Sequence, residues 1–389
     1  MGPLSGLRVI EFEAIGPGPF CGMMLADMGA DVLLVDRKTD PGIGLPRERW
    51  NDVMLRGRRS LTLDLKTADG VEAALRLIEK ADALIEGFRP GVMERLGLGP
   101  DVVLARNPRV VYGRMTGWGQ TGPLARSVGH DIDYIALSGV LNAIGHSNDA
   151  KPTLPLNLVG DFGGGGMLLA FGIACGIIEA RTSGRGQVVD AAMIDGGSTL
   201  AAMFHGMLAS KRWTEERAAN VLDSGAPWYD TYATRDGRWI AIGAIEPPFY
   251  RALLTGLGID SDPALPAQWD RARWPELRAR FAAIVATRTS DEWTRIFEGT
   301  DACVAPVLSF TEARSHPHAL ARDAFIDVGG VAQPAPAPRF DRTPGSARRA
   351  PPERGDGGHD ALADWGFDAD AIAALSALGA GFSSDVKVD

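Results

Sequence analysis

The N-terminal part of the chain alternates an apolar strand, a helix and a second apolar strand, and this pattern constrains the fold more than any other feature. Leu7–Phe12 is a partly β-branched apolar run, and Asp31–Val35 is a second. Between them Phe20–Met28 has the apolar spacing of a helix, after a Gly/Pro loop, and Gly29 is suited to end it. A strand–helix–strand unit of this kind favours a parallel pair with a right-handed crossover.

The same alternation continues toward the middle of the chain. A helix is predicted near Ala68–Lys80, with strands at Ala83–Gly87 and Arg109–Arg114. A loop-rich stretch follows from Trp118 to Pro155, and then an apolar helix from about Gly164 to Arg181. Repeated units of this type predict an α/β fold with an open, doubly wound parallel sheet.

A different pattern, typical of a smaller α+β domain, follows this alternation. Tyr229–Ala233 and Trp239–Ala244 are apolar runs that flank Asp236-Gly237, a strong hairpin signal. Helical patterns follow at Pro248–Gly256 and Pro275–Thr287.

The last part of the chain is rich in proline and arginine. Residues 332–338 and 342–358 are predicted to be extended, exposed connectors, and Ala361–Leu378 a short helix. We therefore expect three parts: a large domain at residues 1–200, a small α+β domain at 225–320, and a C-terminal segment at 330–389 that returns to the large domain.

Composition and charge exclude several classes of protein. A formal net charge of −9 argues against a nucleic-acid-binding surface. The three cysteines, Cys21, Cys175 and Cys303, are far apart and have no metal-ligand or disulfide spacing. The N-terminus has no signal-peptide pattern, and the apolar run Met167–Ile178 is too short to cross a bilayer. We expect a cytoplasmic protein with no metal site, no nucleic-acid partner and no membrane partner.

Asp36 and Arg37 end the second predicted strand. In a dinucleotide-binding fold, an acidic residue at this point would bind ribose hydroxyls. The preceding loop, residues 16–22, fits that interpretation poorly because it misses the third glycine and contains two prolines without backbone donors. The other interpretation is an exposed charge pair at a strand end.

Arg37 is one of several cations that follow predicted strands. Lys66, Arg89 and Arg95 lie just beyond strand ends or in the loops that follow them. In an open parallel sheet these loops converge on the ligand crevice. The pattern favours a ligand with several phosphates, and ordinary solvated charges are the alternative.

His130 follows a glycine-rich loop at residues 116–123 and precedes Asp131. A histidine is the side chain best suited to proton transfer near neutral pH. The alternative is a surface histidine whose neighbour Asp131 caps a helix.

Asp161 lies before the apolar helix and is followed by Gly163-Gly164-Gly165-Gly166. Asp is a favoured N-cap, so a capping role is one interpretation. Four glycines are not needed for a cap, and in a helix interior each costs up to about 1 kcal/mol relative to Ala. We therefore favour close approach of a ligand to backbone N–H groups, which could also bind a developing oxyanion.

Glu246 ends the second strand of the predicted hairpin, directly before Pro247. Its carboxylate could orient a histidine ring or cap the helix that begins at the prolines. The residue taken by itself does not distinguish these roles.

Taken in order, these segments resemble the α-methylacyl-CoA racemases, within the wider class III coenzyme A transferase family. The resemblance covers nearly the whole chain, and each piece is short although the ordered set is specific. The matching segments are residues 3–9, 30–32, 86–91, 115–123, 129–134, 155–165, 186–191, 225–227 and 244–247.

The resemblance implies roles for individual residues. His130 and Asp161 are the two proton-transfer groups, and Glu246 supports the histidine. The residues that match coenzyme A-binding positions are Arg37, Leu63, Asp64, Leu65, Lys66, Gly87, Phe88, Arg89, Arg95, Gly129, Asp131, Ile132, Asp133 and Tyr134. The implied fold is a large Rossmann-like domain and a small domain in an intertwined homodimer. No separate cofactor is implied, because coenzyme A is part of the acyl-CoA substrate.

Two activities are consistent with this resemblance. A racemase would exchange the proton beside the thioester through an enolate, with one base on each face, and would need Asp161 protonated in one direction. Burial would raise the pKa of Asp161 and the helix N-terminus would lower it. A coenzyme A transferase would instead use Asp161 as a nucleophile and would not need His130 or Glu246. We expect the racemase, with an acyl chain that the sequence does not identify.

Overall fold

The computed structural model describes residues 2–383. The chain divides into two compact units. The large unit contains Met1–Ser138, Leu156–Leu200 and Leu320–Asp389, and the small unit contains Gly139–Pro155 and Ala201–Ala319. Each unit is described by itself.

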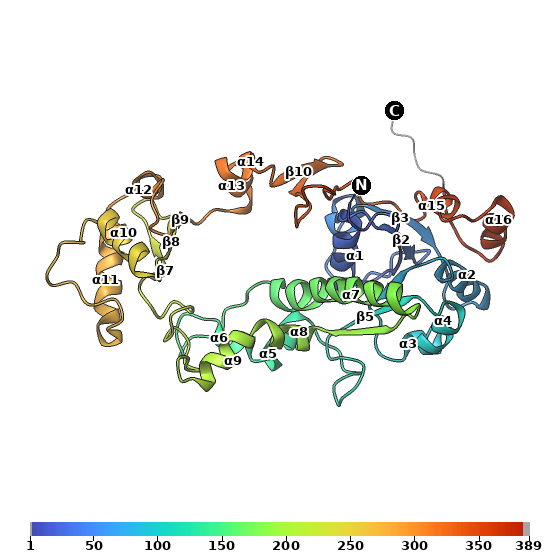
Figure 1. Ribbon diagram of the computed structural model, residues 1–389, viewed down its shortest axis with the longest axis horizontal. Helices are drawn as coiled ribbons and strands as arrows, with labels where there is room; N and C mark the ends of the chain where they lie inside the picture. Colours follow the sequence, from blue (N-terminus) through green and yellow to red (C-terminus); the bar gives the residue numbers. More distant parts are fainter. Residues whose placement is uncertain (1, 384–389) are drawn as a thin grey trace. The chain divides into compact units, whose positions relative to one another are not determined.

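The large unit is built on a six-stranded sheet in the order β3-β2-β1-β4-β5-β6, in which every neighbouring pair is parallel (Figure 1). The order reverses between β1 and β4, and in such sheets ligands bind beyond the carboxyl ends of the strands at the reversal. The strands are β1 (Arg8–Phe12), β2 (Asp31–Asp36), β3 (Arg58–Thr62), β4 (Ala83–Glu86), β5 (Val111–Thr116) and β6 (Val188–Ala192).

Helices cover both faces of this sheet. One core packs Ile10, Leu33 and Leu84 against helices on one face, and the other packs Val9, Val32 and Ile85 against helices on the opposite face. On the first face lie α2 (Ala68–Ile78), α3 (Val92–Arg95), α4 (Pro100–Arg106), α15 (Gly358–Asp364) and α16 (Ala369–Ala377), and on the second α1 (Pro17–Asp27) and α7 (Leu168–Ser183). The α/β class and the doubly wound parallel sheet predicted from the sequence are therefore confirmed.

Two strands of the sheet were not predicted from the sequence. β3 reads Arg-Arg-Ser-Leu-Thr, yet its Arg58 is fully buried because Glu11 on β1 pairs with it at 2.9 Å. β6 reads Val-Val-Asp-Ala-Ala and is the edge strand beside β5. Polar residues in both strands hide the periodicity that marks the others.

Helix α1 begins earlier than predicted. Pro17, Gly18 and Pro19 form its first turn rather than a loop, and proline suits this position because its missing N–H would have no helical partner. Gly16 precedes the helix with φ 65° and ψ −115°, a conformation that glycine adopts most readily.

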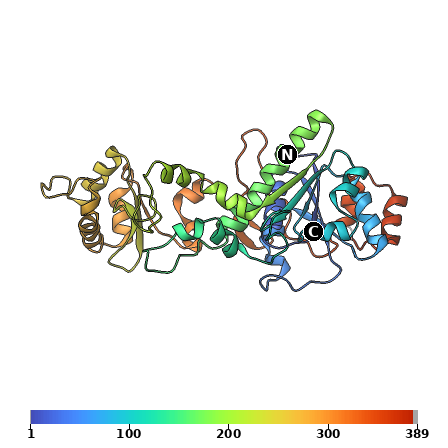
Figure 2. The same ribbon diagram turned by 90° about the horizontal axis from the view of Figure 1, so that it is seen from below.

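The C-terminal segment returns to the large unit, and Figure 2 shows α15 and α16 beside α2 and α4. The single helix predicted over Ala361–Leu378 was wrong, because the chain turns at Gly366, with φ 82°, between two helices. This segment also forms bridges with the edge strand β3, from Ser60 to Gly357 and from Thr62 to Gly381. A hairpin of β10 (Phe325–Val328) and β11 (Val331–Pro334) precedes it.

The longest helical segment runs from Leu158 to Ser183 and starts before the predicted Gly164. Its first part, η3 (Leu158–Met167), is a π-helix that continues directly into α7. By length and composition it could cross a membrane, and 44% of its most apolar window is buried inside the protein. The short apolar run expected from the sequence is therefore part of a longer helix. The remaining helices of this unit are α5 (Asp131–Leu137) and α8 (Met193–Leu200).

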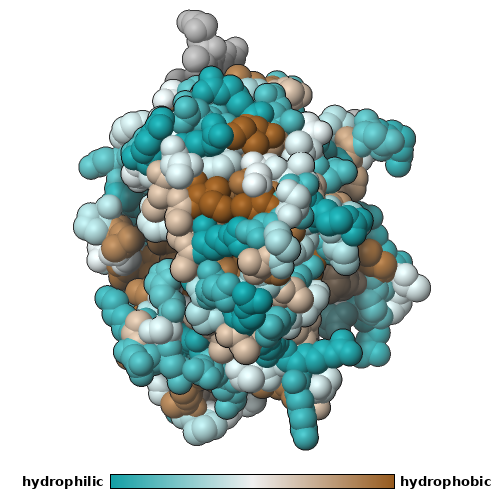
Figure 3. All heavy atoms as spheres, turned by 90° about the vertical axis from the view of Figure 1, so that its left-hand side faces the viewer, coloured by the Kyte–Doolittle hydropathy of each residue, from teal (hydrophilic) through white to brown (hydrophobic). Residues whose placement is uncertain are grey.

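The small unit contains the predicted hairpin, β7 (Tyr229–Ala233) with β8 (Trp239–Gly243), and β9 (Val304–Pro306) completes an antiparallel sheet. Trp228, Phe281 and Trp293 are fully buried in its core. On the face shown in Figure 3, apolar residues form small patches separated by hydrophilic ones. The helices of the small unit are α6 (Val140–Ala143), α9 (Ala202–Ala209), α10 (Pro247–Leu257), α11 (Trp274–Val285), α12 (Ser290–Phe297) and α13 (Phe310–Ser315). The chain passes from the small unit to the large unit within α14 (Pro317–Ala321).

Candidate functional site

His130 is the N-cap residue of α5 in the large unit. Its backbone is extended, and its N–H donates to the Asp133 carboxylate at 2.9 Å. The side chain of His130 is exposed in the single chain. The helix start thus fixes the backbone of the histidine while its ring remains accessible.

Asp131 is buried beneath the start of η3, with 8% of its surface exposed. Its carboxylate accepts a hydrogen bond from the Asp161 N–H at 2.7 Å and another from Gly160 N–H. A side chain at Gly160 would place a Cβ 2.4 Å from the Asp131 carboxylate. Asp131 therefore caps the N-terminus of the next helix and ties it to the residue after His130.

Asp161 lies in the first turn of η3 and is partly buried. Burial raises the pKa of its carboxyl above the usual value; the Asn157 amide, which donates at 3.0 Å, opposes this, and the Asp131 charge adds to it. His130 is close enough that its positive charge lowers the same pKa. The structure therefore brings the two predicted proton-transfer residues together, and the net effect is a carboxyl group that binds its proton more tightly than usual.

The glycine run after Asp161 serves packing between helices. A Cβ at Gly164 would lie 2.7 Å from the Gly197 backbone in α8, and one at Gly166 would lie 2.5 Å from the Pro17 carbonyl in α1. Gly164, Gly165 and Gly166 are all buried. The interpretation of this run as a place for a ligand was wrong, because protein backbone occupies the space that the missing side chains leave.

Tyr134 on α5 supports the loop that carries His130. Its ring would contact any Cβ at Gly117 or Gly129, at 2.0 and 2.8 Å, and it packs edge-on against Trp118. Its hydroxyl donates to the Gly129 carbonyl, and burial raises its pKa to about 12. Tyr134 is thus a neutral packing residue, held between two glycines.

Arg37 follows β2, and Phe88 follows β4, as predicted. The Arg37 guanidinium carbon lies 5.7 Å from the centre of the Phe88 ring, so the two strand-end loops meet across β1. Its Nη1 is 3.4 Å from Glu13, which follows β1 and also accepts from the Arg37 N–H at 2.8 Å. Two of the predicted strand-end residues, Arg37 and Phe88, are therefore adjacent in space.

The other predicted binding residues also follow the carboxyl ends of strands. Asp64, Leu65 and Lys66 form a turn after β3 in which Asp64 accepts from the Lys66 N–H at 3.0 Å. Leu63 and Asp131 are buried, whereas Gly87 and the side chains of six other members are exposed to solvent: Asp64, Lys66, Arg89, Arg95, Ile132 and Asp133. Arg89 is near enough to Tyr134 to affect its titration, which places the β4 loop beside α5.

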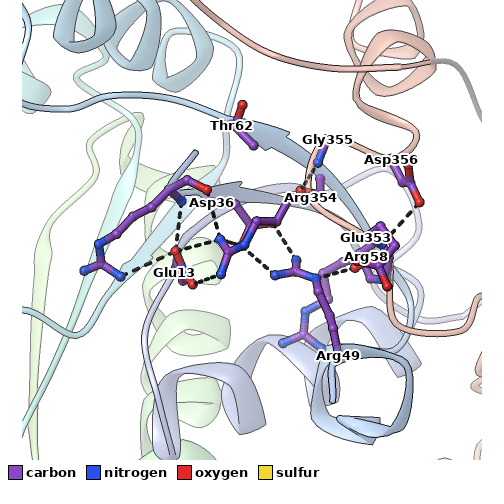
Figure 4. Close-up of polar contacts among 12 residues, drawn as sticks. Glu13, Asp36, Arg49, Arg58, Thr62, Glu353, Arg354, Gly355 and Asp356 are labelled. Atoms are coloured by element: carbon purple, nitrogen blue, oxygen red, sulfur yellow. Dashed lines mark hydrogen bonds and ion pairs between the residues drawn. The ribbon is translucent and has the colours of Figure 1, made fainter. Parts of the chain in front are cut away.

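Sequence reasoning missed a set of ionic residues under these loops (Figure 4). Asp36, which the dinucleotide interpretation assigned to a ribose, accepts two hydrogen bonds from Arg49 and one from Ser60 instead. Arg354 from the C-terminal segment pairs with Glu13 at 2.8 Å. Glu13 could have been predicted only from its position directly after a strand. No feature of the sequence near Arg354 predicts that it belongs to this set.

A second ionic group lies beneath the β4 loop. Arg114 on β5 donates to Glu86 at 2.9 Å and to Glu94 at 2.8 Å, while Glu86 also accepts from the Phe88 N–H. Burial raises the pKa of Glu86 to about 7 despite this partner. A cavity of about 390 Å³ opens beside this group, between Pro90 and residues 120–126.

Glu246 lies in the small unit at the N-cap of α10 and is exposed. No side-chain cap bond is formed by it, so the capping interpretation is not supported. Its partnership with His130 remains a prediction. Among residues 2–383, no three His, Cys, Asp or Glu side chains come together to hold a metal ion.

The large unit thus has a doubly wound parallel sheet, with the predicted cations beyond its strand ends and His130 near Asp161 at a helix junction. Residues 4–358 match CoA-transferase family III, and the chain belongs to that family.

Several relatives are similar over nearly their full length. The chain is 46% identical to the mouse protein and 44% identical to the human protein named alpha-methylacyl-CoA racemase, in each case over 96% of both chains. It is 31% identical to succinyl-CoA–D-citramalate CoA-transferase of Chloroflexus aurantiacus, over 96% of this chain and 97% of that one. A crystal structure of a CAIB/BAIF family protein from Brucella suis superposes with a TM-score of 0.77 at 27% identity, covering 94% of this chain and 99% of that one.

Proposed function

We propose that the protein is an acyl-CoA racemase that interconverts (R)- and (S)-2-methylacyl-CoA thioesters without a separate cofactor. The observation that carries the proposal is the junction of α5 and η3, where His130 acts on an Asp161 whose pKa is raised. Identity of 44–46% to two proteins named racemases supports the same activity.

The reaction requires removal of the proton beside the thioester and its return to the other face. For one enantiomer, neutral His130 takes the α-proton and protonated Asp161 delivers a proton to the enolate; for the other, the roles reverse. In each direction one proton leaves carbon and one returns, so no redox partner is needed. Burial favours the protonated Asp161 that the first direction requires.

Glu246 would orient the imidazole, and the strand-end cluster would bind the phosphates of coenzyme A. The cluster consists of Arg37, Lys66, Arg89 and Arg95, all following strands of one parallel sheet. The Gly160 and Asp161 N–H groups do not serve as enolate donors, because both bind Asp131, and the glycine run packs against α1 and α8.

The second candidate is a coenzyme A transferase. The Asp161 carboxylate would attack the thioester carbonyl, coenzyme A would leave as its thiolate, and an acyl anhydride would form. The similarity to a named CoA-transferase favours it. A raised pKa disfavours it, because it lowers the fraction of Asp161 present as a nucleophilic carboxylate.

A single experiment separates the two. The protein is mixed in D₂O with one enantiomer of a 2-methylacyl-CoA and no acceptor acid. The racemase loses optical activity while deuterium enters the α-position, whereas a transferase requires an acceptor. His130→Ala is the matched variant, and exchange as fast as in the wild type would contradict the proposed role of His130.

We further propose a homodimer, intertwined as the family resemblance implies. Support comes from the continuous helix of η3 and α7, on which Met167, Phe171 and Ile178 are exposed by 49, 67 and 67%. Residues spaced in this way lie near one face of a helix, and such a stripe suits burial against a second copy. Light scattering should give a dimer mass for the wild type and a monomer mass for Phe171→Glu.

The domain roles and the location of the protein are also proposals. The large domain at residues 1–200 would bind coenzyme A, the small domain at 225–320 would supply Glu246, and the segment at 330–389 would complete the large domain. We propose a cytoplasmic protein without nucleic-acid or membrane partners. Because Leu158–Ser183 is long and apolar, membrane flotation tests this directly, and the protein should remain in the soluble fraction.

A further inference from the structure

Arg354 approaches the strand-end cluster from the C-terminal segment, more than 300 residues away in sequence. It donates from Nη2 to Glu13 Oε1 at 2.8 Å and from Nη1 to Glu13 Oε2 at 3.1 Å. It also donates to the Arg37 carbonyl at 2.9 Å and lies 3.3 Å from Asp36 (Figure 4). The segment that carries it is fixed against β3 by the bridges at Gly357 and Gly381.

Glu13 is the acceptor for which two arginines compete. Arg354 makes a bidentate pair with it, the geometry in which a guanidinium binds a carboxylate most strongly. Arg37 has only a contact of 3.4 Å through Nη1, and that nitrogen is shielded from solvent and makes no hydrogen bond within the described part of the chain. Glu13 therefore pairs mainly with Arg354, and the Arg37 side chain, 39% exposed, stays accessible to a ligand.

We propose that Arg354 is a positioning residue that occupies Glu13 and thereby keeps Arg37 available for the phosphates of the acyl-CoA substrate. The inference rests on the proposed function, because it takes coenzyme A as the ligand. Without Arg354, Glu13 would be free to form the bidentate pair with Arg37, and the cation would be withdrawn from the ligand.

The other neighbours of Arg37 do not replace Arg354 in this role. Asp36 is fully buried and already accepts from Arg49 and Ser60. Burial alone would raise the pKa of Glu13, but its bonds from Arg354 and from the Arg37 N–H lower it, so Glu13 is charged at neutral pH. Because Glu13 stays charged beside Arg37, a second cation, Arg354, is needed to pair with it.

Four proteins test the role, with coenzyme A as the probe in titration calorimetry. Arg354→Gln should raise the Kd for coenzyme A about tenfold, the loss expected for one charge-assisted contact. Glu13→Gln with Arg354→Gln should return the Kd to within about twofold of the wild type, because no carboxylate remains to hold Arg37. Glu13→Gln alone should bind at least as tightly as the wild type, and Arg342→Gln, an exposed arginine of the same segment, is the charge-matched control.

Racemisation of 2-methylacyl-CoA by the same proteins should show the defect of Arg354→Gln in KM rather than in kcat. A merely structural role predicts that the double variant binds as weakly as Arg354→Gln or more weakly, and that result would overturn the proposal. An unchanged Kd in Arg354→Gln would overturn it too, while leaving the racemase intact. If Arg354→Gln does not fold, as judged by circular dichroism, the Glu13→Gln protein tests the proposal instead. A Kd for coenzyme A about ten times higher in Glu13→Gln than in the wild type would contradict competition between Glu13 and the ligand for Arg37. A wild type that does not bind coenzyme A would overturn the proposed function itself.

Discussion

Two carboxyl groups in the large unit titrate in opposite directions, although both are partly buried. Asp161, at the junction of α5 and η3, has a raised pKa because burial and the Asp131 charge outweigh the Asn157 amide and His130, which both lower it. Glu13, after β1, has a lowered pKa because Arg354 and the Arg37 N–H donate to it. Burial raises the pKa of each, and the partners decide the sign.

The difference separates proton chemistry from fixed charge. A carboxyl group that readily keeps its proton can act as an acid, and the junction holds one beside a histidine. A carboxylate held between two cations is suited to fixing the position of those cations. Under the proposed function, the large unit would contain a region for moving protons and a region for arranging charges.

The sharpest test of this division is kinetic. His130→Ala should lower kcat about 10³-fold with little change in KM, since general acid–base groups contribute about 10²–10⁴. Arg37→Gln should raise KM about tenfold with little change in kcat, the loss of one contact to a charged group. Initial rates of racemisation over a range of substrate concentration measure both, and a His130→Ala defect confined to KM would remove the histidine from the chemistry.

The junction depends on the close packing of η3, which a single glycine tests. Gly196→Ala would place a Cβ 1.8 Å from the Gly164 carbonyl. We expect a loss of about 1–3 kcal/mol in the free energy of unfolding, as for other overpacked sites. Denaturant titration measures it.

Gly206→Ala is the matched control, because nothing lies within 4 Å of the Cβ it would add in α9. That variant should be neutral or slightly more stable, since alanine is the better helix former. Equal losses in both variants would contradict the packing role of the glycine run.

The sequence predicted the sheet well where burial follows a simple period. The β1–α1–β2 unit, β4, β5 and the β7–β8 hairpin all lie where their apolar patterns indicate. β3 was missed because a buried Arg58 is accommodated only through Glu11 on another strand. No local pattern reveals a long-range ion pair.

The candidate site shows the same limit. The roles of His130 and Asp161 remain predictions. The structure agrees with the expected effect of burial on the pKa of Asp161, whose balance with the helix terminus the sequence left open. The packing role of the glycine run was not predicted. Glycine is needed both where two backbones come close together and where a ligand comes close to the backbone, so the sequence does not distinguish the two. Arg354 could not be predicted, since its contacts depend on where the C-terminal segment returns.

Asp131 should matter because its charge and its hydrogen bonds both act on Asp161. Asp131→Asn removes the charge that raises the Asp161 pKa while retaining an acceptor for one backbone N–H. We expect the rate of racemisation to fall about tenfold, because Asp161 would be displaced or would have an altered pKa. A tenfold loss corresponds to about 1.4 kcal/mol. The limb of the pH–rate profile that reports Asp161 should move to lower pH, and an unchanged limb would limit Asp131 to a capping role.

The smallest expected effects are changes in stability, and they have opposite signs in the two regions. A raised pKa means that folded Asp161 binds a proton more tightly than unfolded Asp161, so stability falls as pH rises from the ordinary Asp pKa to the raised one. Asp161→Asn removes that penalty and should slightly raise Tm at neutral pH. Its activity should nevertheless be lost.

Glu13→Gln should do the reverse. Because the pKa of Glu13 is lowered, its contribution is present above the ordinary Glu pKa and is lost as pH falls through the folded value. Removing the charge should lower Tm at neutral pH by about 2 °C, from about 1–2 kcal/mol of charge-assisted bonds, and should have progressively less effect in acid. Calorimetric melts of both variants between acidic and neutral pH measure the two slopes. Tm changes of the same sign at neutral pH would mean that burial, rather than the partners, governs both carboxyl groups, and the contrast between the two regions would fail.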